Sequence, residues 1–139
     1  MTSALKVLQL LRMALLGSAG IYVILGELLA HHPSAPPNAL LFFVLTFVGA
    51  SEVVMILGVR KLLVVPAAAR LAAQPNDTLA LTRWRGGYIL IFALSESIAL
   101  FGLVLRFLGF TRAQVAPFYL AGIVLLVYFA PREAGNAIG

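Results

Sequence analysis

Residues 93–104 read Ala-Leu-Ser-Glu-Ser-Ile-Ala-Leu-Phe-Gly-Leu-Val and place one carboxylate, Glu96, inside a long apolar run. That run, residues 84–108, is long enough to cross a bilayer as a helix, since about 20 apolar residues suffice. Glu96 lies at its middle, with the hydroxyls of Ser95 and Ser97 on either side. A carboxylate at this depth costs at least a few kcal/mol unless it is neutral, paired or hydrated, so the stretch indicates a functional site.

The composition indicates that the whole chain belongs in a membrane. Of its 139 residues, 62% are hydrophobic and only 11% are charged, which excludes an ordinary soluble domain. The chain has no cysteine, so disulfide and cysteine-zinc frameworks are excluded as well. The net charge of +5 does not indicate a nucleic-acid partner, because the basic residues cluster at the ends of apolar runs. The expected partner is the lipid bilayer.

Four apolar runs predict four transmembrane helices, at residues 4–30, 39–65, 84–108 and 115–130. We therefore expect an all-α integral membrane bundle that forms a single domain. Residues 66–83 form the central polar connection, in which the second helix continues and then turns at Gln74 to Asp77. The first run is too long for a signal peptide and contains Glu27, so we interpret it as a transmembrane helix.

The basic residues predict the orientation of these helices. With four helices threaded, eight basic residues lie on one side of the membrane and two, Arg106 and Arg112, lie on the other. Because basic residues prefer the cytoplasmic side, we expect both termini and the 66–83 connection in the cytoplasm, with the bacterial inner membrane as the expected location. The eight residues are Lys6, Arg12, Arg60, Lys61, Arg70, Arg83, Arg85 and Arg132.

A second carboxylate, Glu52, lies at the midpoint of the 39–65 run. Ser51-Glu52 followed by Gly58 recurs as Ser95-Glu96 followed by Gly102, a match short enough to arise by chance. The depth of the two carboxylates does not depend on that match. Both are near the bilayer centre in helices joined by one connection, so they are positioned to face each other.

Two carboxylates in a low-dielectric environment disfavour each other's charged form, so the pair should hold at least one proton at neutral pH. Ser95 and Ser97 could coordinate a sodium ion or accept a hydrogen bond from protonated Glu96. The functional hypothesis is exchange of H⁺ or Na⁺ at Glu96, Glu52, Ser97 and Ser95. The alternative is that these polar side chains only hold the helices together.

The remaining polar and aromatic residues are interpreted as structural. We expect Glu27 to reach water at the end of the first helix, and Arg106, about 15 Å from Glu96 along its helix, to extend to the interface. His31 and His32 are expected to be exposed in a proline-rich turn, although such a pair can bind metal or sense pH. The aromatic residues expected in the interfacial belts are Trp84, Tyr88, Tyr119, Tyr128 and Phe129.

Residues 96–104, Glu-Ser-Ile-Ala-Leu-Phe-Gly-Leu-Val, resemble the ion-carrying helix of the proteolipid c subunit of rotary ATP synthases. In that family an alanine, an aromatic residue, a glycine and Leu-Val follow the ion-carrying carboxylate in the same spacing. Gln74 and Pro75 also resemble the family's cytoplasmic loop. The resemblance covers residues 67–104 and implies that Glu96 carries the ion and that Ser97 is the hydroxyl residue of sodium-type members.

The leading hypothesis is a proteolipid-like protein that binds a proton or a sodium ion within an oligomer of its own copies or with other membrane subunits. We do not expect an enzyme or a further cofactor, because the sequence has no nucleophile with a base, phosphate loop or metal cluster. The alternative is a non-catalytic accessory subunit of a larger membrane complex. A small transporter is a third hypothesis, but four helices leave little room for a substrate path unless the chain dimerises.

Overall fold

The computed structural model describes residues 2–30 and 36–133, which form helices and the turns that join them. In chain order these are α1 (Thr2–Leu29), α2 (Ala39–Val59), the π-helical turn η1 (Arg60–Val64), α3 (Val65–Ala73), α4 (Thr78–Phe107) and α5 (Arg112–Tyr128). The expected all-α fold is confirmed for the described residues. Three spans, α1, α2 to α3, and α4, are long and apolar enough to cross a membrane, and α5 is a shorter apolar helix.

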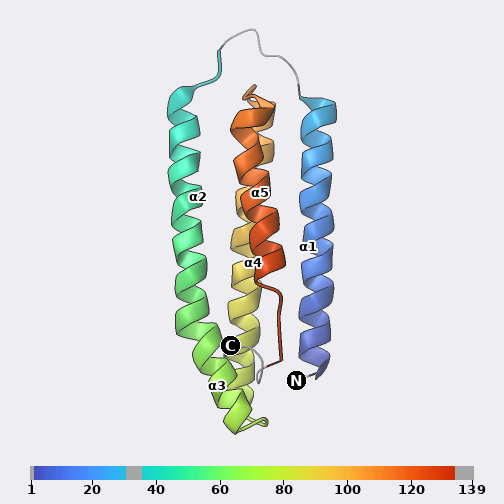
Figure 1. The fold of residues 1–139 in the computed structure, drawn as a ribbon, viewed down its shortest axis with the longest axis vertical. Coiled ribbons are helices and arrows are strands. Elements are labelled where there is room, and N and C mark those ends of the chain that lie inside the picture. Colours follow the sequence, from blue (N-terminus) through green and yellow to red (C-terminus); the bar gives the residue numbers. More distant parts are fainter. Residues whose placement is uncertain (1, 31–35, 134–139) are drawn as a thin grey trace.

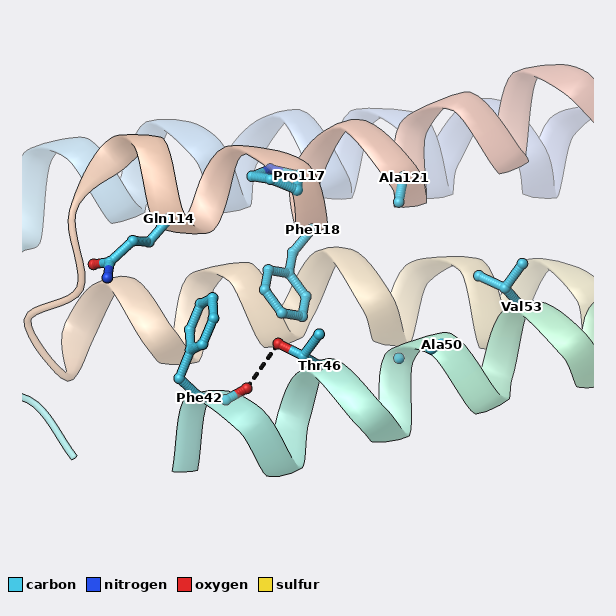
Figure 2. A pocket seen from close by; sticks show the side chains of 9 residues that line it. Phe42, Thr46, Ala50, Val53, Gln114, Pro117, Phe118 and Ala121 are labelled. Carbon is cyan, nitrogen blue, oxygen red and sulfur yellow. Dashed lines mark hydrogen bonds between the residues drawn. The ribbon is translucent and has the colours of Figure 1, made fainter. Parts of the chain in front are cut away.

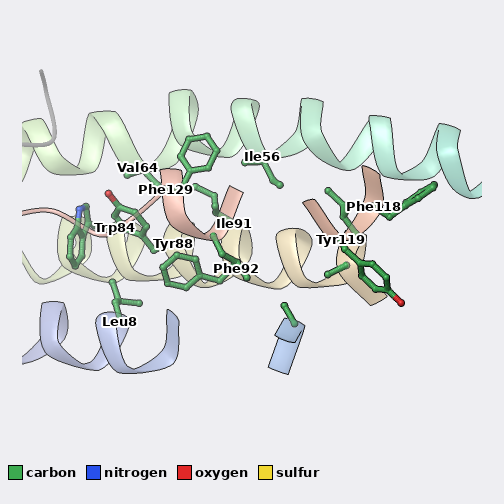
Figure 3. Packing of buried hydrophobic residues seen from close by; sticks show 14 of the residues in the cluster. Leu8, Ile56, Val64, Trp84, Tyr88, Ile91, Phe92, Phe118, Tyr119 and Phe129 are labelled. Carbon is green, nitrogen blue, oxygen red and sulfur yellow. The ribbon is translucent and has the colours of Figure 1, made fainter. Parts of the chain in front are cut away.

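Helix α4 lies at the centre of the bundle, with α1 and α2 on its two flanks and α5 against it (Figure 1). Its buried residues run from Ala80 to Leu105 and include Trp84, Ile91 and Phe92, which Figure 3 labels. Helices α1 and α2 instead leave most of their large apolar side chains exposed. Apolar surface of this kind suits contact with lipid or with other membrane helices.

The connection between the second and third predicted helices is shorter than expected. Helix α3 continues to Ala73 and the chain turns between Gln74 and Asp77, as predicted, but α4 begins at Thr78 rather than at Trp84. The Asp77 side chain accepts a hydrogen bond from the N–H of Ala80, which provides a partner for one of the free donors at the start of the helix. This cap allows the helix to begin in a polar segment that hydrophobicity alone assigns to a loop.

The π-helical turn η1 has a local cause in the sequence. The N–H of Val65 donates to the carbonyl of Arg60, rather than to the residue four positions back. Pro66 follows at the start of α3, and proline lacks an N–H while its ring collides with the carbonyl four residues earlier in a regular helix. The wider turn relieves that collision, and α3 bends across the end of α4 (Figure 1).

Helices α4 and α5 pack closely because glycines lie where they meet. A Cβ atom at Gly122 would lie 2.7 Å from the Cβ of Ala99 and 2.8 Å from the carbonyl oxygen of Ser95. A Cβ atom at Gly102 would lie 2.9 Å from the ring of Tyr119. The absence of a side chain at both glycines therefore lets the two helices approach each other closely.

Most of the aromatic residues expected in interfacial belts are buried between helices instead. They are Trp84, Tyr88, Tyr119 and Phe129, whereas Tyr128 is exposed. Trp84, Tyr88 and Phe92 follow one another along α4, with ring centroids 5.1 Å and 6.0 Å apart (Figure 3). These three rings share one face because residues four apart lie on the same side of a helix, and this face of α4 turns toward the other helices.

Helix α1, the continuous span from α2 to α3, helix α4 and helix α5 run in alternating directions along the bundle. The Thr2 end of α1 and the turn at Gln74 to Asp77 lie at one end, and the turn between α4 and α5 lies at the other (Figure 1). After Tyr128 the chain continues in the direction of α5 toward the first end (Figure 1), and the guanidinium of Arg60 lies 5.4 Å from the ring centroid of Phe129. This cation–π contact ties the segment after α5 to η1.

Candidate functional site

Glu96 and Glu52 each accept a hydrogen bond from a hydroxyl on another helix. The hydroxyl of Tyr22 in α1 donates to Glu96 Oε1 at 2.9 Å, and the hydroxyl of Ser97 in α4 donates to Glu52 Oε1 in α2 at 3.0 Å. Both bonds are part-buried. Within residues 2–30 and 36–133, neither carboxylate forms an ion pair with a basic side chain. The neutral hydroxyls are therefore the hydrogen-bond partners of both groups.

The two carboxylates lie at the same level of the bundle on different flanks of α4. Ser97, the partner of Glu52, is the residue next to Glu96, and consecutive residues of a helix point about 100° apart. Glu96 is therefore directed toward α1 while Ser97 is directed toward α2. Across the described chain the two carboxylates do not hydrogen-bond each other, so the site consists of two separate hydroxyl–carboxylate pairs.

The second oxygen of Glu52 has an unusual environment. Glu52 Oε2 is buried and has no hydrogen-bond partner in the described part of the chain. An anionic oxygen without a donor is costly in an apolar environment, and the neutral acid is less costly there. Glu52 therefore has one oxygen bonded to a hydroxyl and one oxygen without a donor among the described residues.

Ser95 belongs to neither pair. Its side chain is fully buried, and its hydroxyl donates to the carbonyl of Ile91 in the preceding turn at 2.7 Å. Its own carbonyl lies close to Gly122, on the side of α4 that contacts α5. A serine bonded in this way uses its hydroxyl within its own helix. Of the four candidate residues, the structure therefore joins Glu52 to Ser97, joins Glu96 to a residue outside the set, and bonds Ser95 to neither carboxylate.

The residue outside the set is Tyr22, which the sequence analysis did not identify. It is separated from Glu96 by 74 positions in the chain, and an apolar helix offers no local pattern that pairs the two. One signal was present. Tyr22 lies about two turns before the end of α1, deeper than the interfacial position where tyrosine is common in membrane helices.

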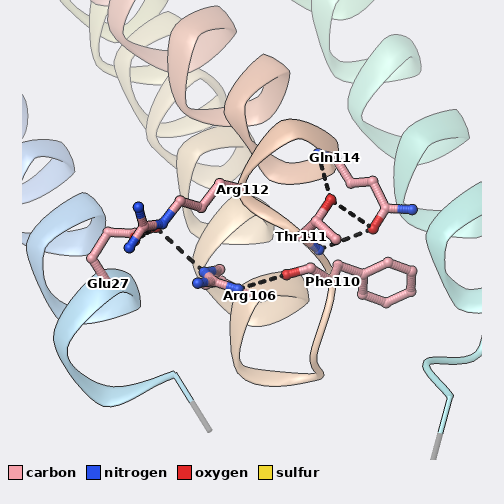
Figure 4. A network of polar contacts seen from close by, with 6 residues as sticks. All are labelled: Glu27, Arg106, Phe110, Thr111, Arg112 and Gln114. Atoms are coloured by element: carbon pink, nitrogen blue, oxygen red, sulfur yellow. Dashed lines mark hydrogen bonds and ion pairs between the residues drawn. The ribbon is translucent and has the colours of Figure 1, made fainter. Parts of the chain in front are cut away.

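Glu27 is bound by two arginines at the end of the bundle where α4 turns into α5 (Figure 4). Arg106 Nε lies 3.3 Å from Glu27 Oε1, and Arg112 Nε contacts Glu27 Oε2. The side chains of Arg106 and Glu27 are only 14% and 30% exposed. Arg106 also donates from Nη1 to the carbonyl of Phe110 at 2.9 Å.

The predictions for Glu27 and Arg106 were therefore wrong. Glu27 was expected to be solvated and Arg106 to extend freely to the interface, but each neutralises the other. The reason is tertiary, because the end of α1 lies beside the α4–α5 turn and brings together charges that are 79 positions apart. As expected, Arg106 does not pair with Glu96.

An apolar pocket of about 360 Å³ lies between α2 and α5 (Figure 2). Its polar lining residues offer little chemistry, because the hydroxyl of Thr46 already donates to the carbonyl of Phe42 at 2.8 Å. No titratable side chain lines it. The pocket is therefore suited to an apolar group rather than to a reaction. Its lining residues are Phe42, Thr46, Gly49, Ala50, Val53, Gln114, Pro117, Phe118 and Ala121.

Metal ligation has no support in the part of the chain that the structure describes. No group of three or more histidine, cysteine, aspartate or glutamate side chains could hold a metal ion among those residues. His31 and His32, which could bind metal or sense pH, lie outside the described residues.

The fold and the site together define a class, a helical bundle of membrane-spanning character with two hydroxyl-bonded carboxylates halfway along its helices. Comparison of the chain with protein-family models, curated proteins and solved structures gives no match. The resemblance of residues 67–104 to the c subunit therefore stays a prediction. The function has to be argued from the site.

Proposed function

We propose that this protein binds and releases protons at Glu96 and Glu52 within an assembly of membrane subunits. The observation that supports the proposal is that both mid-helix carboxylates are bonded to neutral hydroxyls, with no basic partner among the described residues. A carboxylate kept from water without a counter-charge gains most by taking up a proton. A hydroxyl can donate to a carboxylate or accept from a carboxylic acid, so both protonation states keep a partner.

The arrangement favours a proton over a sodium ion. Hard cations are held by several oxygen ligands at once. Ser95, the extra hydroxyl that a sodium site would need near Glu96, lies on the side of α4 that contacts α5, whereas Glu96 is directed toward α1. The two carboxylates also bond to different helices, so neither pair gathers the oxygens of the other. A proton needs only one carboxylate oxygen.

In this proposal the end of the bundle with Thr2 and the Gln74 to Asp77 turn faces the cytoplasm. Eight of the ten basic residues belong to segments at this end, as basic residues do in a bacterial inner membrane protein. The exposed apolar sides of α1 and α2 face lipid or neighbouring subunits. The resemblance of Glu96 and the residues after it to the c subunit agrees with this proposal.

The test is labelling of the purified protein with dicyclohexylcarbodiimide, which reacts with protonated carboxyl groups in apolar surroundings. We expect adducts at Glu96 and Glu52, mapped by mass spectrometry, and a decrease in labelling as the pH rises from about 6 to about 9, because the protonated fraction falls. The Glu96→Gln variant should lose the adduct at residue 96 and keep the one at residue 52. Glutamine retains an oxygen that can accept the Tyr22 hydrogen bond, so the helices should stay in contact.

Glu27 provides the control within the same chain. Each of its two carboxylate oxygens is in an ion pair with an arginine, so we expect it to stay unlabelled across the same pH range. Adding sodium should leave labelling of Glu96 unchanged, whereas protection by sodium would indicate a sodium site. If Glu96 and Glu52 react no more than Glu27 does, the proposal of proton binding is wrong.

A second candidate is a packing subunit without ion exchange. The supporting observation is that the two hydroxyl–carboxylate bonds join α4 to α1 and to α2. Bonds between membrane helices contribute about 1 kcal/mol or less each. In this case labelling would not vary with pH over the tested range, and Tyr22→Phe would weaken the contact of α1 with α4 without changing the labelling of Glu96.

A further inference from the structure

A polar cavity lies at the end of the bundle where α1 ends and the chain turns from α4 into α5. Its volume is about 510 Å³, and its charged lining residues are Glu27, Arg106 and Arg112 (Figure 4). The remaining lining residues are Ala30, Gly109, Thr111 and Ala113. This cavity is separate from Glu52 and Glu96, because Arg106 lies about 15 Å from Glu96 along α4. It takes no part in the proposed proton binding.

The charges around the cavity do not balance. Two guanidinium groups face one carboxylate, which leaves a net charge of about +1 at neutral pH. A guanidinium has five N–H donors, and Glu27 and the carbonyl of Phe110 accept only a few of those available. The terminal nitrogens of Arg112 have no partner among the described residues, and its side chain is 77% exposed. The cavity therefore has surplus positive charge and free donors with a fork geometry.

Helix α5 adds to this charge. It begins at Arg112, and its first N–H groups lie where Arg112 and Ala113 line the cavity. The side chains of Thr111 and Gln114 form a capping box that provides a partner for the N–H of Gln114 and for that of Thr111 itself. This cap provides no hydrogen-bond acceptor for the N–H groups of Arg112 and Ala113. The start of a helix also carries a partial positive charge.

A further unused donor lies near the cavity. The hydroxyl of Tyr119 is buried and has no hydrogen-bond partner among the described residues. It lies against Gly26, the residue before Glu27, and within electrostatic range of Glu27 and Arg106. The region thus combines a cavity, two arginines, a helix N-terminus and a free hydroxyl, which together favour an anion with several oxygens.

We propose that this cavity binds a phosphate group, with Arg112 and Arg106 as its main ligands. A planar guanidinium binds the oxygens of a phosphate with two parallel hydrogen bonds, and Arg112 has the exposure and the free donors to do so. Glu27 holds the two arginines in place in the absence of the anion and competes with it. The phosphate belongs either to an anionic lipid headgroup or to a soluble ion, since both present the same oxygens at the end of a membrane helix.

The experiment measures both sources with the purified protein in detergent. Native mass spectrometry counts the molecules of dioleoylphosphatidylglycerol that the protein retains. Dioleoylphosphatidylcholine, which has zero net charge, is the control lipid. Equilibrium dialysis measures the binding of radiolabelled inorganic phosphate. For the anion that binds, we expect Arg112→Gln to reduce retention about tenfold, as for the loss of a charge-assisted bidentate contact. Arg112 is mostly exposed, so this variant should fold normally.

Two further variants make the test specific. Arg85→Gln removes the same charge from an exposed position toward the other end of α4, and it should bind as the wild type does. Glu27→Gln removes the competing carboxylate, and it should bind the anion several-fold more tightly. Retention of the lipid alone assigns the site to a headgroup, and binding of inorganic phosphate assigns it to a soluble ion. The proposal is overturned if neither binds, or if Arg112→Gln and Arg85→Gln reduce binding equally.

Discussion

Replacement of Gly122 with alanine is expected to destabilise the protein by about 3 kcal/mol, at the upper end of what overpacking costs. The added Cβ would lie 2.7 Å from the Cβ of Ala99 and 2.8 Å from the carbonyl oxygen of Ser95. Neither atom is the end of a flexible side chain, so α5 must move away from α4. Unfolding in a denaturing detergent, followed by the fluorescence of Trp84, the one tryptophan of the chain, measures the change.

Gly17→Ala is the matched control. It makes the same substitution within α1, where a Cβ atom would meet nothing within 4 Å. Because alanine is the better helix former, this variant should be as stable as the wild type or more stable by up to about 1 kcal/mol. Equal stability of the Gly122→Ala and Gly17→Ala variants would show that the close contact of α4 with α5 does not exist.

Replacement of Glu27 with glutamine is expected to destabilise the protein by about 2 kcal/mol. Loss of one partner of a buried ion pair costs about 3–5 kcal/mol. This pair is partly exposed, so we expect about half of that cost. The physical reason is that Arg106, with 14% of its side chain exposed, is left without its counter-charge. The same unfolding measurement applies, and phosphate or phosphatidylglycerol should restore part of the loss if either binds the cavity.

Arg112→Gln is the control for this second prediction. Its side chain is 77% exposed, so its loss should cost less than about 1 kcal/mol, and Glu27 keeps Arg106 as a partner. The double variant Glu27→Gln, Arg106→Gln should be more stable than Glu27→Gln alone, because it removes the unpaired guanidinium. If Glu27→Gln costs no more than Arg112→Gln, Arg106 does not depend on Glu27 for its charge balance.

Helix α1 contributes to both polar regions of the molecule. Tyr22 bonds to Glu96 near the middle of the bundle, and Glu27 holds Arg106 and Arg112 at its end. Few of the apolar side chains of α1 are buried. These two polar contacts therefore contribute much of what fixes the position of α1 against α4.

Much of the fold could be predicted from local features of the sequence. The apolar runs, the turn between Gln74 and Asp77 and the proline at the start of α3 each act over a few neighbouring residues, and the helices are found close to where they were expected. The start of α4 was missed because the cap at Asp77 depends on one polar side chain and not on hydrophobicity. The depth of Glu52 and Glu96 also followed from counting residues along their runs.

The partners of these groups could not be predicted in the same way. The residues of α2 are themselves apolar on nearly every side of the helix. Its sequence therefore has no amphipathic stripe to show which face turns inward. The bond of Tyr22 to Glu96, the bond of Ser97 to Glu52 and the inward-facing aromatic residues of α4 depend on the rotation of each helix about its axis. That rotation is set by the packing of whole helices, at the glycines of α4 and α5 above all.

The sequence by itself determined that this chain forms apolar helices with carboxylates at mid-depth, because length, hydrophobicity and helix rise are local properties. Only the tertiary structure decided that those carboxylates bond to separate hydroxyls and that Glu27 lies between two arginines. These contacts all join residues 45 or more positions apart in the chain. They form only when the helices pack, since no local rule relates one helix face to another.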